Sequence, residues 1–190
     1  YLSIVNSLST YGEVDQQGEL HTAVTKFTSK EKPVLSIVIA ALGNLMLKNA
    51  GELADGTITW MTGPETIRTH IAPKITQSAH DTGKASPRII AGLPLCVTDN
   101  KGNGFQEASR HFGRYGELPS YRSMINRENA ESPAELAVIG NEQEIEEKLR
   151  QYAASGTTEI AAQIFPETPG NKDSILRSRE ALINLIGKIS

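Results

Sequence analysis

One cysteine and four histidines are the side chains of this 190-residue sequence most suited to metal or nucleophilic chemistry. The histidines do not share the spacing of a zinc site, so we predict no metal site. Cys96 lies in an apolar stretch, so we interpret it as an inert core thiol, and a single cysteine excludes an intrachain disulfide. The histidines are His21, His70, His80 and His111.

Residues 99–133 form a long excursion between two strand patterns, with two short helical stretches. An excursion of this length is more often a functional insertion than a plain connector. Arg110, His111 and Arg114 could face an anionic ligand there, although we favour a solvated basic face. The candidates for a pocket lid in the same insertion are Tyr115, Tyr121 and Arg122.

Several function classes lack support in the sequence. It contains no Gly-x-Ser-x-Gly elbow, no Walker loop and no Gly-x-Gly-x-x-Gly, so hydrolase, nucleoside triphosphatase and Rossmann dehydrogenase readings have no motif. The net charge of -3 gives no electrostatic footprint for nucleic acid or an anionic membrane. The longest apolar run, around Val34–Ala41, is too short to span a bilayer. We therefore expect a cytoplasmic protein with neither partner.

Four strand patterns alternate with helical patterns along the chain. The first is a nearly unbroken β-branched run, which predicts a strand buried on both faces rather than an edge strand. Pro94 removes a ladder donor from the third, which predicts a break or bulge there. The patterns are Pro33–Ala41, Thr57–Thr62, Arg88–Val97 and Thr158–Phe165.

Capping residues mark the first two helices between these strands. We expect Asn44 to cap a helix that ends at a left-handed Gly56. A second helix is expected from Pro64 to Gly83, with a kink at Pro73.

Helical signals also occur near both ends of the chain. Asn141 precedes an acidic helix start, and a last helix is expected from about Ser174 to Lys188. Tyr1–Leu8 is interpreted as the end of a helix, followed by a polar loop or weak hairpin over 12–32.

The alternating order predicts a parallel α/β architecture with right-handed crossovers. Four βα units are about half of what an eight-stranded barrel needs. They form either a small open sheet or the second half of a barrel, and the opening helix tail favours the second. The start at Tyr1 rather than Met also suggests a fragment or processed product.

The stretch Ala40–Gly56, continued by Thr57–Pro64, resembles the luciferase-like monooxygenase superfamily, and within it the coenzyme F420-dependent oxidoreductases. The resemblance runs from about Tyr1 to Phe165. Supporting pieces are Arg88–Pro94, Tyr115–Tyr121, Val138–Glu142 and Ala154–Glu159.

This resemblance implies a TIM-barrel-like α/β fold, of which the chain is the C-terminal half with about four parallel βα units. The chain would then be one partial luciferase-like domain over 1–190. Its parts are an incoming helix end and loop (1–32), three strands with helices (33–98), an insertion (99–133) and a last helix-strand-helix unit (134–190).

The resemblance also implies where the cofactor lies. In this family the loop after the strand ending at Ala41 approaches the cofactor through backbone groups. Glycine permits close backbone approach, and a helix start offers unpaired amides to a phosphate. A tight turn without a ligand is the alternative reading of Gly43. The cofactor-binding positions are Leu42, Gly43, Asn44, Leu45 and Met46, with Asn44 where the family usually has Pro.

The resemblance further implies that Trp60, Thr62 and Gly63, at the end of the next strand, line the substrate pocket. In sugar-phosphate-oxidising relatives a lysine occupies the Gly63 position, and its absence argues against that substrate. The catalytic acid/base groups of such enzymes lie on early strands that this chain lacks. We therefore assign no catalytic residue.

The implied activity is hydride transfer between coenzyme F420 and a small organic substrate. An FMN-dependent luciferase-like monooxygenase is one alternative, and a non-catalytic half-barrel binding module is another. Because open parallel edges favour pairing with another chain, we also expect a homo-oligomer.

Overall fold

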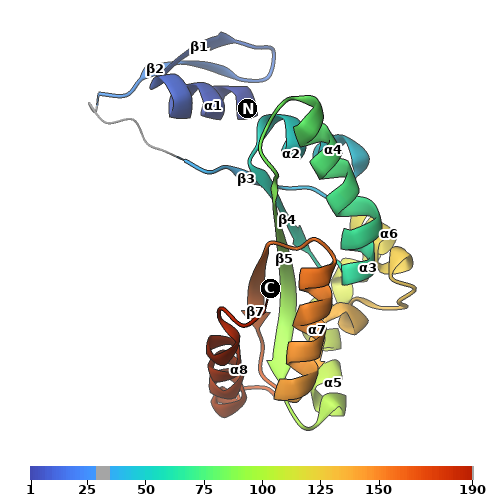
Figure 1. Ribbon diagram of the computed structural model, residues 1–190. Helices are drawn as coiled ribbons and strands as arrows, with labels where there is room; N and C mark the ends of the chain where they lie inside the picture. Colours follow the sequence, from blue (N-terminus) through green and yellow to red (C-terminus); the bar gives the residue numbers. More distant parts are fainter. Residues whose placement is uncertain (29–34, 190) are drawn as a thin grey trace.

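The computed structural model describes residues 1–28 and 35–189. It begins with helix α1 (Leu2–Tyr11), which ends at Gly12 in the left-handed region with φ 75°. Strands β1 (Glu13–Gln17) and β2 (Thr22–Lys26) follow as an antiparallel hairpin at one end of the molecule (Figure 1). The expected helix end and weak hairpin are thereby confirmed.

The main sheet is parallel, which confirms the predicted fold class. Its longest strand, β5, pairs with β4 along Arg88–Gly92 and with β6 along Leu95–Val97. Strand β7 pairs with Ile90–Leu95, and because those residues overlap both other pairings, β7 lies on the opposite edge of β5. The strands are β3 (Val38–Ala40), β4 (Gly56–Trp60), β5 (Arg88–Val97), β6 (Val138–Gly140) and β7 (Glu159–Ile164), of which β6 was not predicted as a strand.

Strand β3 differs from its prediction. Within the described residues it pairs only with β4, and its residues are half-buried or exposed. The expectation of a strand buried on both faces is wrong there, because an apolar run indicates burial but not which neighbour supplies it. The Asp55 side chain holds the residue just before β3, since its Oδ2 accepts from the Ile37 amide at 2.7 Å. The predicted positions Pro33 and Val34 lie outside the described residues.

Pro94 does not break β5, which is continuous over ten residues. Backbone groups alternate between the two edges of a strand, and the amide of Arg88 donates toward β4, to the Asp55 carbonyl. The nitrogen of Pro94 therefore points to the same edge. It falls in the gap between β4, which ends opposite Gly92, and β6, which starts opposite Leu95. No residue of β4 or β6 pairs with Pro94, so its lack of an N–H removes no hydrogen bond between strands.

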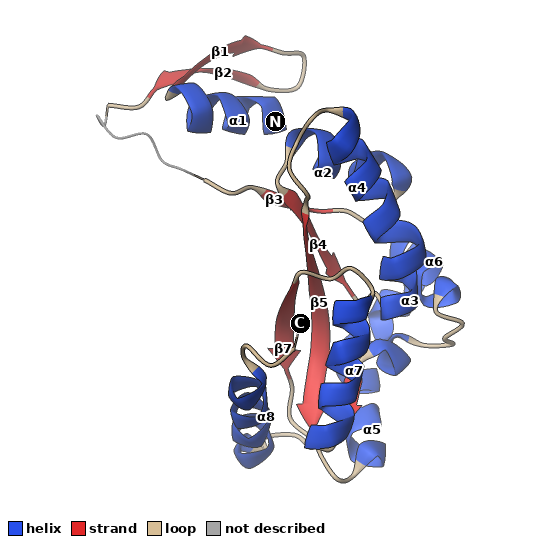
Figure 2. Ribbon diagram, in the orientation of Figure 1, coloured by secondary structure: helices blue, strands red, loops and turns tan. Residues whose placement is uncertain are grey.

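Helices pack on one face of the sheet (Figure 2). Alternate β5 residues, such as Ala91, Leu93 and Leu95, are fully or almost fully buried beneath them. This core also contains Leu47, Ile71, Ile75 and Ile145. The helices are α2 (Asn44–Leu53), α3 (Pro64–Thr66), the π turn η1 (Ile67–Ile71), α4 (Ala72–Asp81), α7 (Glu142–Ala154) and α8 (Lys172–Leu185).

Two of the expected helix caps are wrong. Gly43, not Asn44, is the N-cap of α2, and Asn44 is its first helical residue. The helix ends at an extended Ala54, and Gly56 begins β4. Gly56 is needed for another reason, because a Cβ there would lie 2.2 Å from the Arg88 carbonyl oxygen.

Other helix-end predictions are confirmed. Gly83 has φ 71° just after α4. The Asn141 side chain accepts from the Glu144 amide, while the Glu144 carboxylate accepts from the Asn141 amide. The kink predicted at Pro73 is replaced by the π turn η1 (Ile67–Ile71), which lies just before Pro73 and leads into α4.

The insertion packs on the second face, at the carboxyl ends of β4 and β5. Met61, Cys96, Phe112 and Ile125 form the buried centre of this second cluster. The predicted helical stretches are present, each starting earlier than expected. The insertion elements are α5 (Lys101–Phe112), the 3-10 turn η2 (Gly113–Glu117), α6 (Pro119–Arg127) and the 3-10 turn η3 (Pro133–Leu136).

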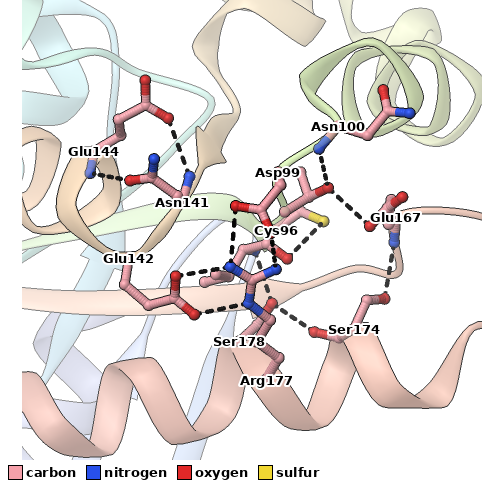
Figure 3. A network of polar contacts seen from close by, with 12 residues as sticks. Cys96, Asp99, Asn100, Asn141, Glu142, Glu144, Glu167, Ser174, Arg177 and Ser178 are labelled. Carbon is pink, nitrogen blue, oxygen red and sulfur yellow. Dashed lines mark hydrogen bonds and ion pairs between the residues drawn. The ribbon is translucent and has the colours of Figure 1, made fainter.

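A polar network ties α8 to the rest of the fold (Figure 3). The Arg177 guanidinium donates to both carboxylate oxygens of Glu142, at 2.7 and 2.8 Å, and to Asp99 at 2.8 Å. The buried Ser178 hydroxyl accepts from the Val97 amide at 2.8 Å. Helix α8 is thus fastened to α7, to the loop after β5 and to β5 itself. None of the helices in the described part of the chain is long and apolar enough to cross a membrane.

Candidate functional site

The loop between β3 and α2 contains a glycine that the fold does not require. Gly43 has φ -85° and ψ 159°, a conformation open to any residue. A Cβ built at this position has no heavy atom within 4 Å. Neither backbone strain nor packing therefore explains the glycine.

The first turn of α2 leaves backbone donors free. The first helical hydrogen bond runs from the Leu47 amide to the Gly43 carbonyl at 2.9 Å. The amides of Asn44, Leu45 and Met46 have no acceptor among residues 1–28 and 35–189. No acidic side chain occupies this turn, and Leu45 and Met46 are exposed. Free amides at the positive end of a helix dipole suit an anionic group such as a phosphate.

The carboxyl end of β4 holds the second group of predicted positions. The half-buried Trp60 ring meets Phe112 and Tyr115 edge to face, with centroids 5.9 and 6.1 Å apart. Its Nε1 is buried without a partner among the described residues. Thr62 is buried: its hydroxyl donates to the Trp60 carbonyl at 3.1 Å, and its own carbonyl accepts from the Tyr152 hydroxyl at 3.2 Å. Thr62 therefore stabilises the turn after β4 through buried hydrogen bonds.

Gly63 makes room for a carboxylate from the insertion. A Cβ on Gly63 would lie 2.3 Å from the carboxyl carbon of Glu128. One oxygen of that carboxylate accepts from the amide of Thr66, the last residue of α3, at 2.5 Å. The preceding Met61 is fully buried with φ 50°, a conformation that is uncommon for a residue other than glycine. A contact between Gly63 and Glu128, 65 positions apart, carries no local sequence signal.

A cavity of about 350 Å³ lies on the second face of the sheet, beside Trp60. Gly92 borders this cavity together with Trp60. A Cβ on Gly92 would lie 2.3 Å from the Thr59 carbonyl oxygen and 3.2 Å from Trp60 Cε3. Apart from Trp60, the residues that line this cavity were not predicted from the sequence, although alternate positions of paired strands share one face. The lining includes Ala40, Ile58, Trp60, Gly92, Ala161 and Gln163.

The insertion candidates divide into two groups. Tyr115 contacts Trp60, and its ring lies 4.9 Å from that of Tyr121. Arg122 is engaged by backbone carbonyls, including that of Gly116 at 2.9 Å. In the basic group, Arg110 and His111 both contact the buried Glu107 carboxylate, at 2.7 and 3.2 Å, whereas the Arg114 guanidinium lies 5.9 Å from the centroid of the Tyr115 ring.

The remaining reactive groups point to no further chemistry. Burial raises the pKa of Cys96 to about 11, which keeps the thiol protonated. The described residues contain no cluster of three or more His, Cys, Asp or Glu suited to a metal ion.

A comparison with models of protein families identifies the family of this chain. The sequence model of a family described as luciferase-like monooxygenase matches residues 1–159. A sequence comparison with curated proteins finds no match.

Solved structures of several enzymes share the fold. An F420-dependent secondary alcohol dehydrogenase, solved with an F420-acetone adduct, superposes with a TM-score of 0.71 at 16% identity, over 95% of this chain and 58% of that one. The coenzyme F420 dependent tetrahydromethanopterin reductase from Methanopyrus kandleri gives 0.67 at 17%, over 95% and 60%. The oxygenating constituent of 3,6-diketocamphane monooxygenase from Pseudomonas putida, in complex with FMN, gives 0.62 at 11%, over 99% and 60%. This chain thus spans less than two thirds of each of these proteins.

Proposed function

Because the chain belongs to the luciferase-like monooxygenase family, we propose that it supplies the cofactor-phosphate loop of an oxidoreductase that transfers a hydride between coenzyme F420 and a small organic substrate. An FMN-dependent monooxygenase is the alternative. The deazaflavin or flavin supplies the redox chemistry, and the protein contributes binding, orientation and exclusion of water.

The observation that carries this proposal is the loop at Gly43. A glycine that neither conformation nor packing requires precedes three free amides at a helix start. An anion that approaches the backbone closely explains both features, because a side chain at Gly43 would occupy the space that the anion needs. The donor set therefore fits the phosphate of either cofactor.

The substrate side of the proposal rests on Trp60. Its ring borders the cavity on the second face, and its buried Nε1 is a donor without a partner among the described residues. Thr62 and Gly63 contribute by holding the turn after Trp60, through Tyr152 and Glu128. A small organic molecule fits a cavity of this size and mainly apolar lining.

An equilibrium titration of the purified chain with coenzyme F420 and with FMN, followed by cofactor fluorescence, tests the proposal. We expect saturable binding of one cofactor. Gly43→Val should abolish it, because the valine side chain fills the approach to the amides while its φ and ψ suit the loop.

Gly113→Val is the matched control. Gly113 also has negative φ and open space around a Cβ, but it lies in the insertion, away from the α2 loop. This variant should bind like the wild type. A folded wild-type chain that binds neither cofactor, or a Gly43→Val chain that binds normally, would contradict the proposal.

A non-catalytic binding module is the second candidate. It is favoured by the edges of the main sheet, since β3 and β7 each have only one neighbouring strand within the described residues. Unpaired strand edges recruit other chains.

A further inference from the structure

His70 reaches the cofactor loop from a neighbouring element. It is 4% exposed, and its Nε2 lies 2.8 Å from the Leu42 carbonyl oxygen. A carbonyl only accepts, so Nε2 carries the hydrogen and donates it. The contact joins the element after β4 to the loop after β3.

His70 lies on the inner face of the π turn η1. Within η1, Ile67, His70 and Ile71 are all buried. Positions three and four apart share one face of a helix, so His70 is buried beside the two isoleucines. Single π turns inside α-helices are frequent at functional sites.

The contact decides what the Leu42 carbonyl does. In a longer helix this carbonyl would accept from the Met46 amide, four residues on. No such bond forms among the described residues, and Leu47 to Gly43 is the first helical bond. Gly43 is extended, so α2 begins at Asn44 and the Met46 amide stays free, while the Leu42 carbonyl is held by His70.

The contact also sets the direction of the next amide. A peptide unit is planar and trans, so the Gly43 N–H points opposite to the Leu42 carbonyl. Because His70 holds that carbonyl toward the buried side, the Gly43 N–H faces outward, beside the free amides of Asn44 and Leu45.

From this geometry we propose that His70 is a positioning residue for the cofactor phosphate, acting through the Leu42–Gly43 peptide. The inference rests on the proposed function, in which the phosphate binds at the α2 start. His70 does not touch the cofactor itself. It keeps the Gly43 and Met46 amides available to the phosphate.

The charge state of the ring agrees with this role. Burial lowers the pKa of His70, and the positive charges of Arg127 and Lys74 lower it further, while the Leu42 carbonyl opposes the shift. The ring is therefore neutral near pH 7, with its hydrogen on Nε2.

Four variants test the inference. His70→Leu removes the donor, His70→Asn shortens its reach, and His70→Gln keeps a donor of similar reach. His80→Leu is the matched control, since His80 lies on α4 with its side chain 84% exposed. Each chain is titrated with whichever of coenzyme F420 and FMN binds the wild type. Amide hydrogen exchange at Met46 is followed by NMR without cofactor.

We expect about a tenfold weaker affinity for His70→Leu and His70→Asn, the size of one hydrogen bond. The His70→Gln and His80→Leu chains should bind like the wild type. The Met46 amide should become protected in His70→Leu and His70→Asn, because the released Leu42 carbonyl then accepts from it.

Unchanged Met46 exchange in both donor-loss variants would overturn the inference, as would wild-type affinity in both. If His70→Leu fails to fold, His70→Asn measured against His70→Gln decides alone. If the wild type binds neither cofactor, the proposed function fails, whereas the exchange experiment still tests how His70 holds the loop.

Discussion

Glycines in this chain are required for different physical reasons, and packing accounts for several of them but not for Gly43. Gly56, Gly63 and Gly92 each lie where a Cβ would come within 2.3 Å of another atom. Gly43 alone among these four has open space around it. The first three are required by packing, whereas Gly43 is left to be explained by something outside the chain.

This distinction predicts opposite stability effects of one substitution. Gly56→Ala places a methyl group 2.2 Å from the Arg88 carbonyl oxygen, so overpacking should cost about 1–3 kcal/mol of unfolding free energy. Gly43→Ala should change stability by no more than about 0.5 kcal/mol. Urea denaturation of both variants measures the difference. Equal losses would show that Gly43 is also a packing residue.

Tyr152 connects the turn after β4 to α7, and its hydroxyl can be removed alone. Tyr152→Phe leaves the buried Thr62 carbonyl without its donor, which should cost about 1–3 kcal/mol of unfolding free energy. Tyr11→Phe, at a position that is 67% exposed, serves as the control and should be neutral. Chemical denaturation compares them, and a stable Tyr152→Phe chain would show that water replaces the hydroxyl.

The role of a single residue could be predicted from the sequence where its partner lies only a few positions away. The Asn141 cap was predictable because its partner, Glu144, is three positions away. The cap at Asn44 was wrong because Gly43 is extended and its carbonyl accepts from the Leu47 amide, so the helix begins one residue earlier than predicted. The proposed roles of Leu42 to Met46, Trp60, Thr62 and Gly63 stay predictions until cofactor and substrate binding are measured.

At the scale of elements, alternation and apolar runs located strands and helices but not their neighbours. The bounds of β5 were predicted to the residue, yet its continuity through Pro94 depends on two short strands sharing one edge. Strand β6 escaped prediction because three residues are too few to show a period. The π turn escaped it because the isoleucine spacing suits an ordinary helix.

The attachment of α8 should make stability depend on pH. The guanidinium of Arg177 holds the pKa of Glu142 at about 2, below its ordinary value of 4.5. Because the folded-state pKa is the lower one, the stabilisation is present above about pH 4.5 and is lost as the pH falls toward 2. Urea midpoints between pH 2 and 7 should fall less steeply for Glu142→Gln than for the wild type. Parallel curves would show that the Glu142–Arg177 pair contributes nothing.

At the scale of the molecule, the alternation of strand and helix patterns predicted the parallel α/β class. It did not predict which strands lie at the edges of the sheet or which apolar surface stays uncovered. Strands β3, β4, β5 and β7 lie in sequence order, with one unpaired edge at each end within the described residues. A groove of about 540 Å³ runs beside β7, lined by apolar residues of α7, β7 and α8. Ile183 and Ile186 stand exposed there, at 57% and 76%.

These edges predict that the chain associates with a second copy. Four of the five parallel strands that the structure describes, β3, β4, β5 and β7, are half the number in a closed eight-stranded barrel, so two copies that join β7 of one to β3 of the other would pair both of these edges. Sedimentation velocity at rising concentration should then show a shift from one chain to two.

A proline can test whether the β7 edge makes the contact. The Phe165 amide donates to Leu95, so the Ala162 amide, an odd number of positions away, points to the free edge. Ala162→Pro should therefore weaken the dimer and leave the circular dichroism unchanged, because no ladder bond is lost. Ala161→Pro removes a donor directed at β5 and should instead lower the stability of the monomer. A wild-type chain that stays monomeric at every concentration, or an Ala162→Pro dimer as tight as the wild type, would show that another surface covers these edges.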